Sequence, residues 1–118
     1  KVKGEKTIEI WGSGNPLREF MHVDDLASAI IFLLKKEVSQ DILNIGSGEE
    51  VSINVLANKI KSVVNFEGEL IFNDKFPDGN PRKLLDSSAI NKLGWSSSID
   101  LDSGLKSTYE WYKNNLTT

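Results

Sequence analysis

The chain contains 118 residues, with 14 Lys and Arg against 17 Asp and Glu, which gives a net charge of −3. The charges are interspersed without a basic cluster, which argues against binding along a nucleic-acid backbone, and the absence of cysteine excludes disulfides and thiolate ligands. The longest apolar run, residues 26–34, is about half as long as a membrane span requires. We therefore expect a cytoplasmic protein that binds neither nucleic acid nor membrane.

The start of the chain reads as the interior of a longer protein. It has no initiator Met and no charged-then-apolar leader, and it enters a strand pattern almost at once. Residues 7–11 alternate in polarity and predict a short strand, which ends at the glycine- and proline-containing turn 12–16. A second extended segment is expected over 18–23. A helix is predicted over 25–36, with Asp24 or Asp25 as the residue that caps its N-terminus.

This helix is apolar on more than one face over the run LASAIIFLL, a pattern typical of a helix that is buried from several sides. A domain of this size has little to supply that cover, so we expect the packing partner to lie outside the chain. Residues 41–45, DILNI, predict a compact buried strand closed by Gly46, Ser47 and Gly48. A helix is predicted over 52–64, because its apolar residues repeat with the helical period.

The second half of the chain predicts a strand, a loop and two helices. Residues 69–73 alternate as a short strand, and residues 74–84 form an irregular loop with two prolines. A short helix is expected over 86–93, capped by Asp86 and ended by Gly94, and a last helix follows Asp100, with residues 117–118 frayed. The predicted fold class is α/β, in one domain of residues 1–118 with short strands and about four helices.

Two patterns suggest cofactor binding or catalysis, but each has a structural interpretation that we favour. Gly46-x-Gly48 lacks the third glycine of a dinucleotide-binding turn, since Val51 stands in its place, and is interpreted as a strand-to-helix turn. Tyr109-x-x-x-Lys113 has the catalytic spacing of short-chain dehydrogenases, yet Tyr109 falls on the apolar stripe of the last helix. No nucleotide-binding unit precedes it in the chain, so packing is the favoured role.

The single histidine and the adjacent carboxylates also favour structural roles. A metal site at His22 would need carboxylates for every other ligand, so a hydrogen-bonded structural histidine is the simpler interpretation. Asp24 and Asp25 are neighbours at a helix start, where caps are expected, whereas an acid–base pair must face one substrate. We therefore predict no catalytic, cofactor-binding or metal-ligating residue in this chain.

The polar residues around the first turn and the proline-rich loop are the candidates for ligand binding. Arg18 can aim its guanidinium inward at a diphosphate, or it can form a salt bridge to Glu19 or Asp24. Trp11 offers a flat face to a base or sugar, or it packs in the core. The proline-rich loop carries a polar cluster of Asp78, Arg82 and Lys83.

Four motifs together resemble a known family. They stand here, in order, as IWGSGNPLREFMHVDD, ILNIGSGEEVSI, FPDGNPRKLLDSSAINKLGW and LKSTYEWY. This series is similar to the C-terminal portion of the GDP-L-fucose synthases, which are extended short-chain dehydrogenases/reductases, over about residues 7 to 113. The REFMHVDD core is shared with related nucleotide-sugar epimerases and dehydratases. The combination of WGSGNPLREF with PDGNPRKLLD is more specific.

The resemblance implies the C-terminal, GDP-sugar-binding portion of an NADP-dependent epimerase/reductase that lacks most of its Rossmann domain. By position it makes Trp11, Arg18, Asp78 and Lys83 substrate-binding residues, and residues 24–46 a segment that packs on the nucleotide-binding domain. Catalytic and NADP-binding residues lie upstream in that family, so this chain alone is expected to be inactive. The full protein is expected to be a homodimer, and the chain alone to self-associate through apolar surface. The alternatives are the same portion of another nucleotide-sugar enzyme, or a small non-catalytic binding or self-association domain.

Overall fold

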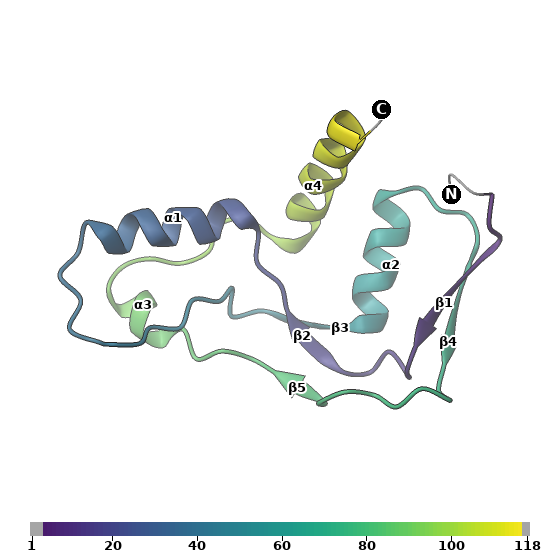
Figure 1. Cartoon of the computed structure of the whole chain (residues 1–118), viewed down its shortest axis with the longest axis horizontal. Coiled ribbons are helices and arrows are strands. Elements are labelled where there is room, and N and C mark those ends of the chain that lie inside the picture. The colour runs from purple at the N-terminus through teal and green to yellow at the C-terminus, as the bar shows by residue number, and fades with distance from the viewer. Residues whose placement is uncertain (1–3, 117–118) are drawn as a thin grey trace.

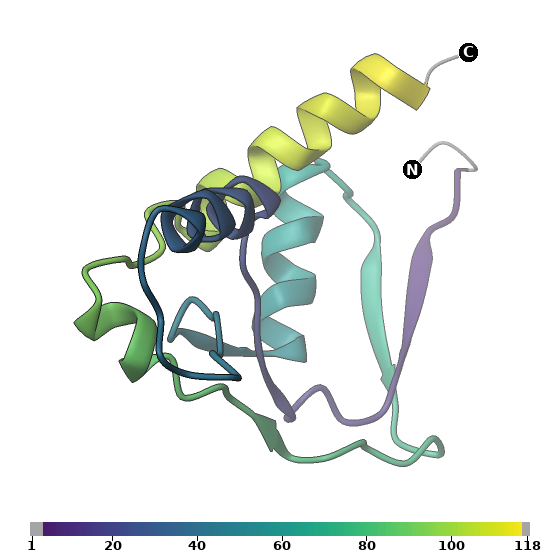
Figure 2. The same cartoon turned by 60° about the vertical axis from the view of Figure 1, so that its left-hand side comes forward.

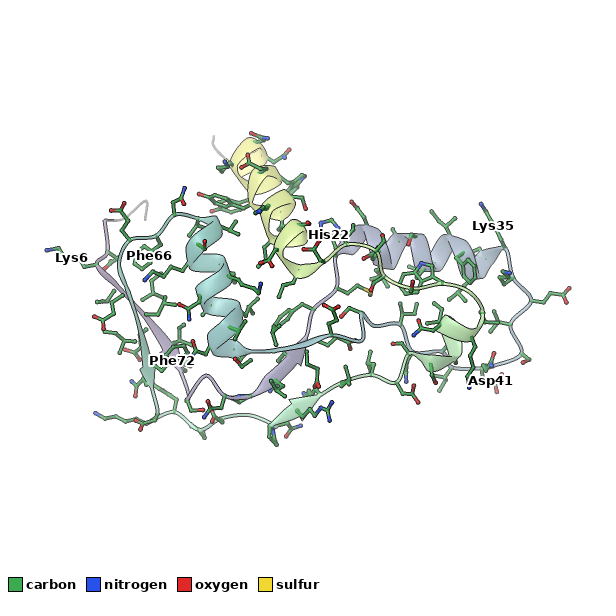
Figure 3. All side chains as sticks on the ribbon, turned by 180° about the vertical axis from the view of Figure 1, so that it is seen from behind. Lys6, His22, Lys35, Asp41, Phe66 and Phe72 are labelled. Atoms are coloured by element: carbon green, nitrogen blue, oxygen red, sulfur yellow. The ribbon has the colours of Figure 1, made fainter. Side chains whose placement is uncertain are left out.

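The computed structural model describes residues 4–116, which form four helices and two small sheets (Figure 1). The strands β1 (Thr7–Trp11) and β4 (Glu69–Asn73) are both as predicted. They pair in parallel, with Trp11 opposite Asn73. Phe72 lies on the side of this pair that faces the α2 helix, Ile53–Val63 (Figure 3).

The second sheet consists of very short strands in the order β3 (Glu50–Ser52), β2 (Leu17–Glu19) and β5 (Arg82–Lys83). β2 is antiparallel to β3 and parallel to β5. The extended segment predicted over 18–23 is therefore shorter than expected, and the loop predicted over 74–84 contains a strand. Strands of two or three residues are too short to show an alternating pattern, and these exist because β2 supplies a neighbour on each side.

The helices agree with the prediction except at their ends. α1 covers Val23–Leu34 and begins earlier than predicted, because its N-cap is His22 and not Asp24 or Asp25. The Nδ1 atom of His22 accepts a hydrogen bond from the amide of Asp24 at 3.2 Å. α2 begins after Ser52, whose hydroxyl accepts from the amide of Val55 at 3.1 Å.

The last two helices also agree with the prediction except at their ends. α3 is shorter than expected, Ser88–Lys92, and its N-cap is Ser87 and not Asp86, although the Asp86 carboxylate accepts a hydrogen bond from the Ser88 amide. Gly94 follows α3 with a φ of 101°, as expected for the residue that ends a helix. α4 covers Leu101–Leu116, and Asp100 accepts from Ser103 at its N-terminus, as predicted. The fraying predicted for residues 117–118 falls outside the described residues.

The strand predicted over 41–45 is absent, and this prediction was wrong. The segment is extended, but no strand among residues 4–116 lies beside it to complete a ladder. Ile42 is 85% exposed. The turn at Gly46 and Gly48 consequently leads into β3 and only then into α2.

The core is small and lies between α1, α3 and the segment before α4. Its buried apolar residues are Ala29, Ile90 and Trp95, and the indole nitrogen of Trp95 donates to the hydroxyl of Ser28 at 3.0 Å. The outer side of α1 is different, because an apolar row there is exposed. We call this row the α1 stripe; it consists of Val23, Leu26, Ile30 and Leu34. Figure 2 shows α1 nearly end-on, at the periphery of the molecule above α3.

Asp25 joins α1 to the segment before α4. Its carboxylate is 3% exposed and accepts hydrogen bonds from the amides of Ser98 and Ile99, at 3.1 and 3.0 Å, and from the Ser98 hydroxyl at 3.0 Å. Burial on its own would raise the pKa of Asp25, but these hydrogen bonds outweigh it, and the pKa is lowered. The charge is thus held by donors that belong to the opposite half of the chain.

The overall shape is extended for a chain of this length. The radius of gyration is 17.2 Å, whereas a compact domain of about 100 residues has about 13 Å. In Figure 3, Lys6 and Phe66 lie at one end of the long axis and Lys35 and Asp41 at the other. Within residues 4–116, no helix is both long and apolar enough to cross a membrane.

Candidate functional site

The candidate site begins at the turn where β1 ends. Gly12 and Gly14 have φ values of 90° and 80°, which side chains other than glycine rarely adopt. Neither position has room for a Cβ atom, which would overlap the carboxylate of Asp78 at Gly12 and the ring of Phe72 at Gly14. Glycine is therefore required here both for the turn and for the close approach of the second segment.

Trp11, one of the predicted site residues, lies at the end of β1. Trp11 is 69% exposed, so it is not a core residue. Its ring stacks on Phe76, with the two centroids 4.4 Å apart and the planes inclined by 14°. The stack limits the orientations of the indole and leaves much of it open to solvent.

The loop that follows β4 is fixed to the turn by an aspartate. The two carboxylate oxygens of Asp78 accept from the amide and the hydroxyl of Ser13, at 2.8 and 2.6 Å. These hydrogen bonds, that from the hydroxyl above all, lower the pKa of Asp78. Asp78 is therefore a carboxylate at neutral pH, beside Gly12.

The guanidinium of Arg18 is anchored by main-chain carbonyls and not by a carboxylate. Its Nη1 atom donates to the carbonyls of Leu17 and Asn80, at 2.6 and 2.8 Å, and the residue is half-buried. The alternative of a salt bridge to Glu19 or Asp24 is wrong, because the ion pairs found within residues 4–116 do not include Arg18. Arg18 is thus oriented, and its charge is not neutralised.

Lys83 lies beside Arg18 on the neighbouring strand. The two residues are paired in the register of β5 with β2, so their side chains leave the same face of the sheet. Lys83 is exposed, and it too is missing from the ion pairs of the described residues. Two adjacent like charges repel each other, so this arrangement favours an anion as a ligand.

Arg82, which precedes Lys83 on β5, differs from it in having a carboxylate partner among the described residues. Arg82 projects to the opposite face, where its guanidinium binds both carboxylate oxygens of Glu50 at 2.8 and 2.9 Å. The hydrogen bond and charge of Arg82 hold the pKa of Glu50 below its ordinary value. On one face the charge of Arg82 is therefore neutralised by Glu50, and on the other face Arg18 and Lys83 present positive charge.

The four predicted site residues all lie on two segments that run side by side, residues 11–18 and 74–83. Three partners of these residues were not predicted from the sequence, namely Ser13, Phe76 and Asn80. The signal for Phe76 was an aromatic residue in an otherwise polar loop. A wide cavity of about 1200 Å³ lies elsewhere, around Lys61 and Phe66, and its lining carries both signs of charge.

The turn at 46–48 contacts Glu19, and it joins an irregular segment to β3 instead of the predicted strand to a helix. The amide of Gly48 donates to the Glu19 carboxylate at 2.6 Å, and a Cβ at Gly46 would overlap the same carboxylate. Because a side chain of the protein already occupies this turn, it does not fit a dinucleotide pyrophosphate.

The remaining candidates have structural contacts. The Nε2 atom of His22 lies 3.1 Å from the Ser107 hydroxyl, so both ring nitrogens are used within the chain, between α1 and α4 (Figure 3). Lys113 is ion-paired with Glu110 at 2.6 Å and lies over the ring of Tyr109. Among the described residues, no group of three or more His, Asp and Glu is arranged to hold a metal ion.

Comparison with known proteins agrees with the resemblance seen in the motifs. Residues 1–46 match the NAD dependent epimerase/dehydratase family. GDP-L-fucose synthase 1 of Arabidopsis thaliana is 51% identical over 116 residues, which is 98% of this chain and 36% of that protein. The chain therefore spans about a third of the length of the curated relatives it matches.

Solved structures share the fold. A GDP-mannoheptose C4 reductase from Campylobacter jejuni with NADP bound is 43% identical with a TM-score of 0.80, over 92% of this chain and 35% of that one. A GDP-L-fucose synthetase from Naegleria fowleri has a TM-score of 0.87 at 26% identity, over 95% of this chain and 35% of that one. The resemblance to GDP-L-fucose synthases is confirmed, and so is the predicted α/β fold of the C-terminal portion of an extended short-chain dehydrogenase/reductase.

Proposed function

We propose that this chain is the GDP-sugar-binding portion of an NADP-dependent epimerase/reductase of the GDP-L-fucose synthase type. The observation that carries the proposal is the pair of adjacent cations, Arg18 and Lys83, neither of which has a carboxylate partner among residues 4–116. The same two segments also carry an exposed aromatic ring, that of Trp11. The sequence similarity supplies the class of ligand.

Each site residue has a role that its chemistry supports. The guanidinium of Arg18 offers the planar donors that bind two oxygens of a diphosphate, and Lys83 adds a second positive charge. Trp11 presents a flat apolar face on which a base or a sugar ring stacks. Asp78 accepts hydrogen bonds at the rim of the site. None of these four residues transfers a proton or hydride in the proposal.

The reaction itself requires the part of the enzyme that binds NADP, and we place the catalytic residues there. The exposed α1 stripe and the extended shape support docking of residues 24–46 on that nucleotide-binding domain. The α1 stripe is apolar and continuous along one side of the helix, as an internal packing surface would be. The proposal includes an isomerase step, a homodimeric enzyme and a cytoplasmic location.

The direct test is turnover. The enzyme that contains this chain should oxidise NADPH when it is given GDP-4-keto-6-deoxymannose, and the isolated chain of 118 residues should not. Activity with a different GDP-sugar, and none with this one, would favour the alternative of another nucleotide-sugar enzyme. NADPH oxidation by the isolated chain would refute the proposal that catalysis requires the NADP-binding part of the enzyme. A folded enzyme whose Trp fluorescence does not respond saturably to GDP would favour a non-catalytic binding domain.

The α1 stripe leads to a prediction for the isolated chain. Because the stripe is uncovered, we expect the chain to self-associate at micromolar concentrations, and the double substitution Ile30→Lys with Leu34→Lys to return it to a monomer. Sedimentation velocity measures this directly. The control is Ile71→Lys, which places one lysine on an exposed apolar position of β4, outside the α1 stripe. A wild-type chain that remains monomeric would contradict the prediction.

A further inference from the structure

Two segments that are distant in the sequence run in the same direction at the site and touch at three successive points. Every second residue from 76 to 80 contacts a residue of the segment 11–18. We call this set of contacts the zipper; its pairs are Phe76 with Trp11, Asp78 with Ser13, and Asn80 with Arg18. Each pair contains one residue proposed to bind the sugar nucleotide, and the pair of Asp78 with Ser13 lies between the other two.

We propose that Ser13 is a positioning residue of this site, which holds Asp78 and through it keeps residues 74–81 against Trp11 and Arg18. The inference rests on the proposed function, because it deepens the account of the same site. Ser13 donates to both oxygens of one carboxylate, so a single residue fixes the orientation of Asp78. No other pair of the zipper is joined by two hydrogen bonds to a charged group.

The hydroxyl of Ser13 is itself fixed at both ends. It donates to Asp78 at 2.6 Å and accepts from the amide of Asn15 at 3.1 Å. The hydroxyl hydrogen is therefore donated within the protein and is not available to a ligand. This favours a positioning role over direct contact with the ligand. The adjacent Gly12 leaves the space that the carboxylate occupies, so the turn is shaped around this interaction.

The zipper explains how Ser13 reaches the ligand-binding residues. The carbonyl of Asn80 holds Nη1 of Arg18, and Phe76 limits the orientation of Trp11. If residues 74–81 move away, both anchors are lost together, and the two side chains must be ordered again when the ligand binds. Ordering a flexible side chain on binding weakens affinity without removing any contact to the ligand.

The experiment compares two serines in equivalent hydrogen-bond pairs. Ser103 donates its amide and hydroxyl to Asp100, at 2.9 and 2.8 Å, as Ser13 does to Asp78, but at the start of α4. In the enzyme, Ser13→Ala should raise the Kd for GDP about tenfold. The KM for the sugar nucleotide should rise with it while kcat stays within about twofold. Ser103→Ala should leave both constants unchanged, and Ser13→Thr, which keeps the hydroxyl, should restore affinity.

A double-mutant cycle between Ser13→Ala and Asp78→Ala tests whether Ser13 acts through Asp78. Strong non-additivity, with the double variant no weaker than Asp78→Ala, is expected. Additive losses would overturn the inference, as would equal constants for Ser13→Ala and Ser103→Ala in an enzyme that binds GDP and is weakened by Arg18→Ala. If the wild-type enzyme does not bind GDP, the proposed function fails first, and this inference fails with it.

Discussion

Replacing Arg18 by alanine is expected to weaken binding of GDP on the order of 10- to 100-fold. The reason is that a half-buried guanidinium, already oriented by two carbonyls, loses charge-assisted hydrogen bonds to a diphosphate that water cannot replace with the same geometry. Quenching of Trp fluorescence measures the Kd, and the concentration of salt should be held constant because the contact is ionic.

Two further arginine variants make this result specific. Arg18→Lys keeps the charge but loses the planar fork, so an intermediate loss of affinity is expected. Arg82→Ala removes one arginine from the same sheet, on the face where Glu50 binds it, and should leave the Kd unchanged. An equal loss for Arg82→Ala and Arg18→Ala would show that the overall charge of the region, and not a site at Arg18, attracts the nucleotide.

Asp25→Asn is expected to lower the free energy of unfolding by about 2–3 kcal/mol. The asparagine has nearly the same shape, but its amide group turns a donor toward amides and a hydroxyl that need an acceptor. Denaturant unfolding of the chain, followed by circular dichroism, measures the change. Asp24→Asn is the matched control, because the neighbouring carboxylate is 77% exposed. Similar losses for both variants would contradict a special role for Asp25.

Asp25 also makes the free energy of unfolding depend on pH in the acid range. Because the pKa of Asp25 is lowered in the folded state, its contribution is complete above the unfolded-state pKa and is lost as the pH falls through the folded-state value. The stability of Asp25→Asn should therefore depend less on pH below about pH 4 than that of the wild type. Some dependence should remain, since Asp78, Asp86 and Asp100 also have lowered pKa values. Parallel curves for the two proteins would contradict this assignment.

The elements that the sequence predicted correctly are those that carry their own pattern. β1, β4 and α2 show a clear period of apolar residues, so they could be placed before any tertiary contact was known. β3 and β5 are too short for a pattern and depend on β2. Residues 41–45 have the composition of a buried strand, but a strand also needs a neighbour, and composition does not reveal whether one is present.

The site was predicted in part for a similar reason. Trp11, Arg18, Asp78 and Lys83 could be named because their side chains suit a nucleotide sugar and stand in recognisable motifs. Ser13 and Asn80 were missed because they act on other residues of the protein, and such pairs are separated by more than sixty positions. The N-cap role of His22 was missed for a different reason. The interaction is local, but N-cap positions are more often occupied by Ser, Thr, Asp or Asn.

The two connections that lead from the first sheet to the second have a mechanical consequence. Residues 12–16 join β1 to β2, and residues 74–81 join β4 to β5, so each strand of one parallel pair continues into a strand of the other. Two chain connections consequently join the sheets, which limits how far the sheets can move apart. The short connection has no room for an extra residue, so an insertion in 12–16 would shift the register of β2. The longer connection, 74–81, can absorb one as a bulge at its exposed surface.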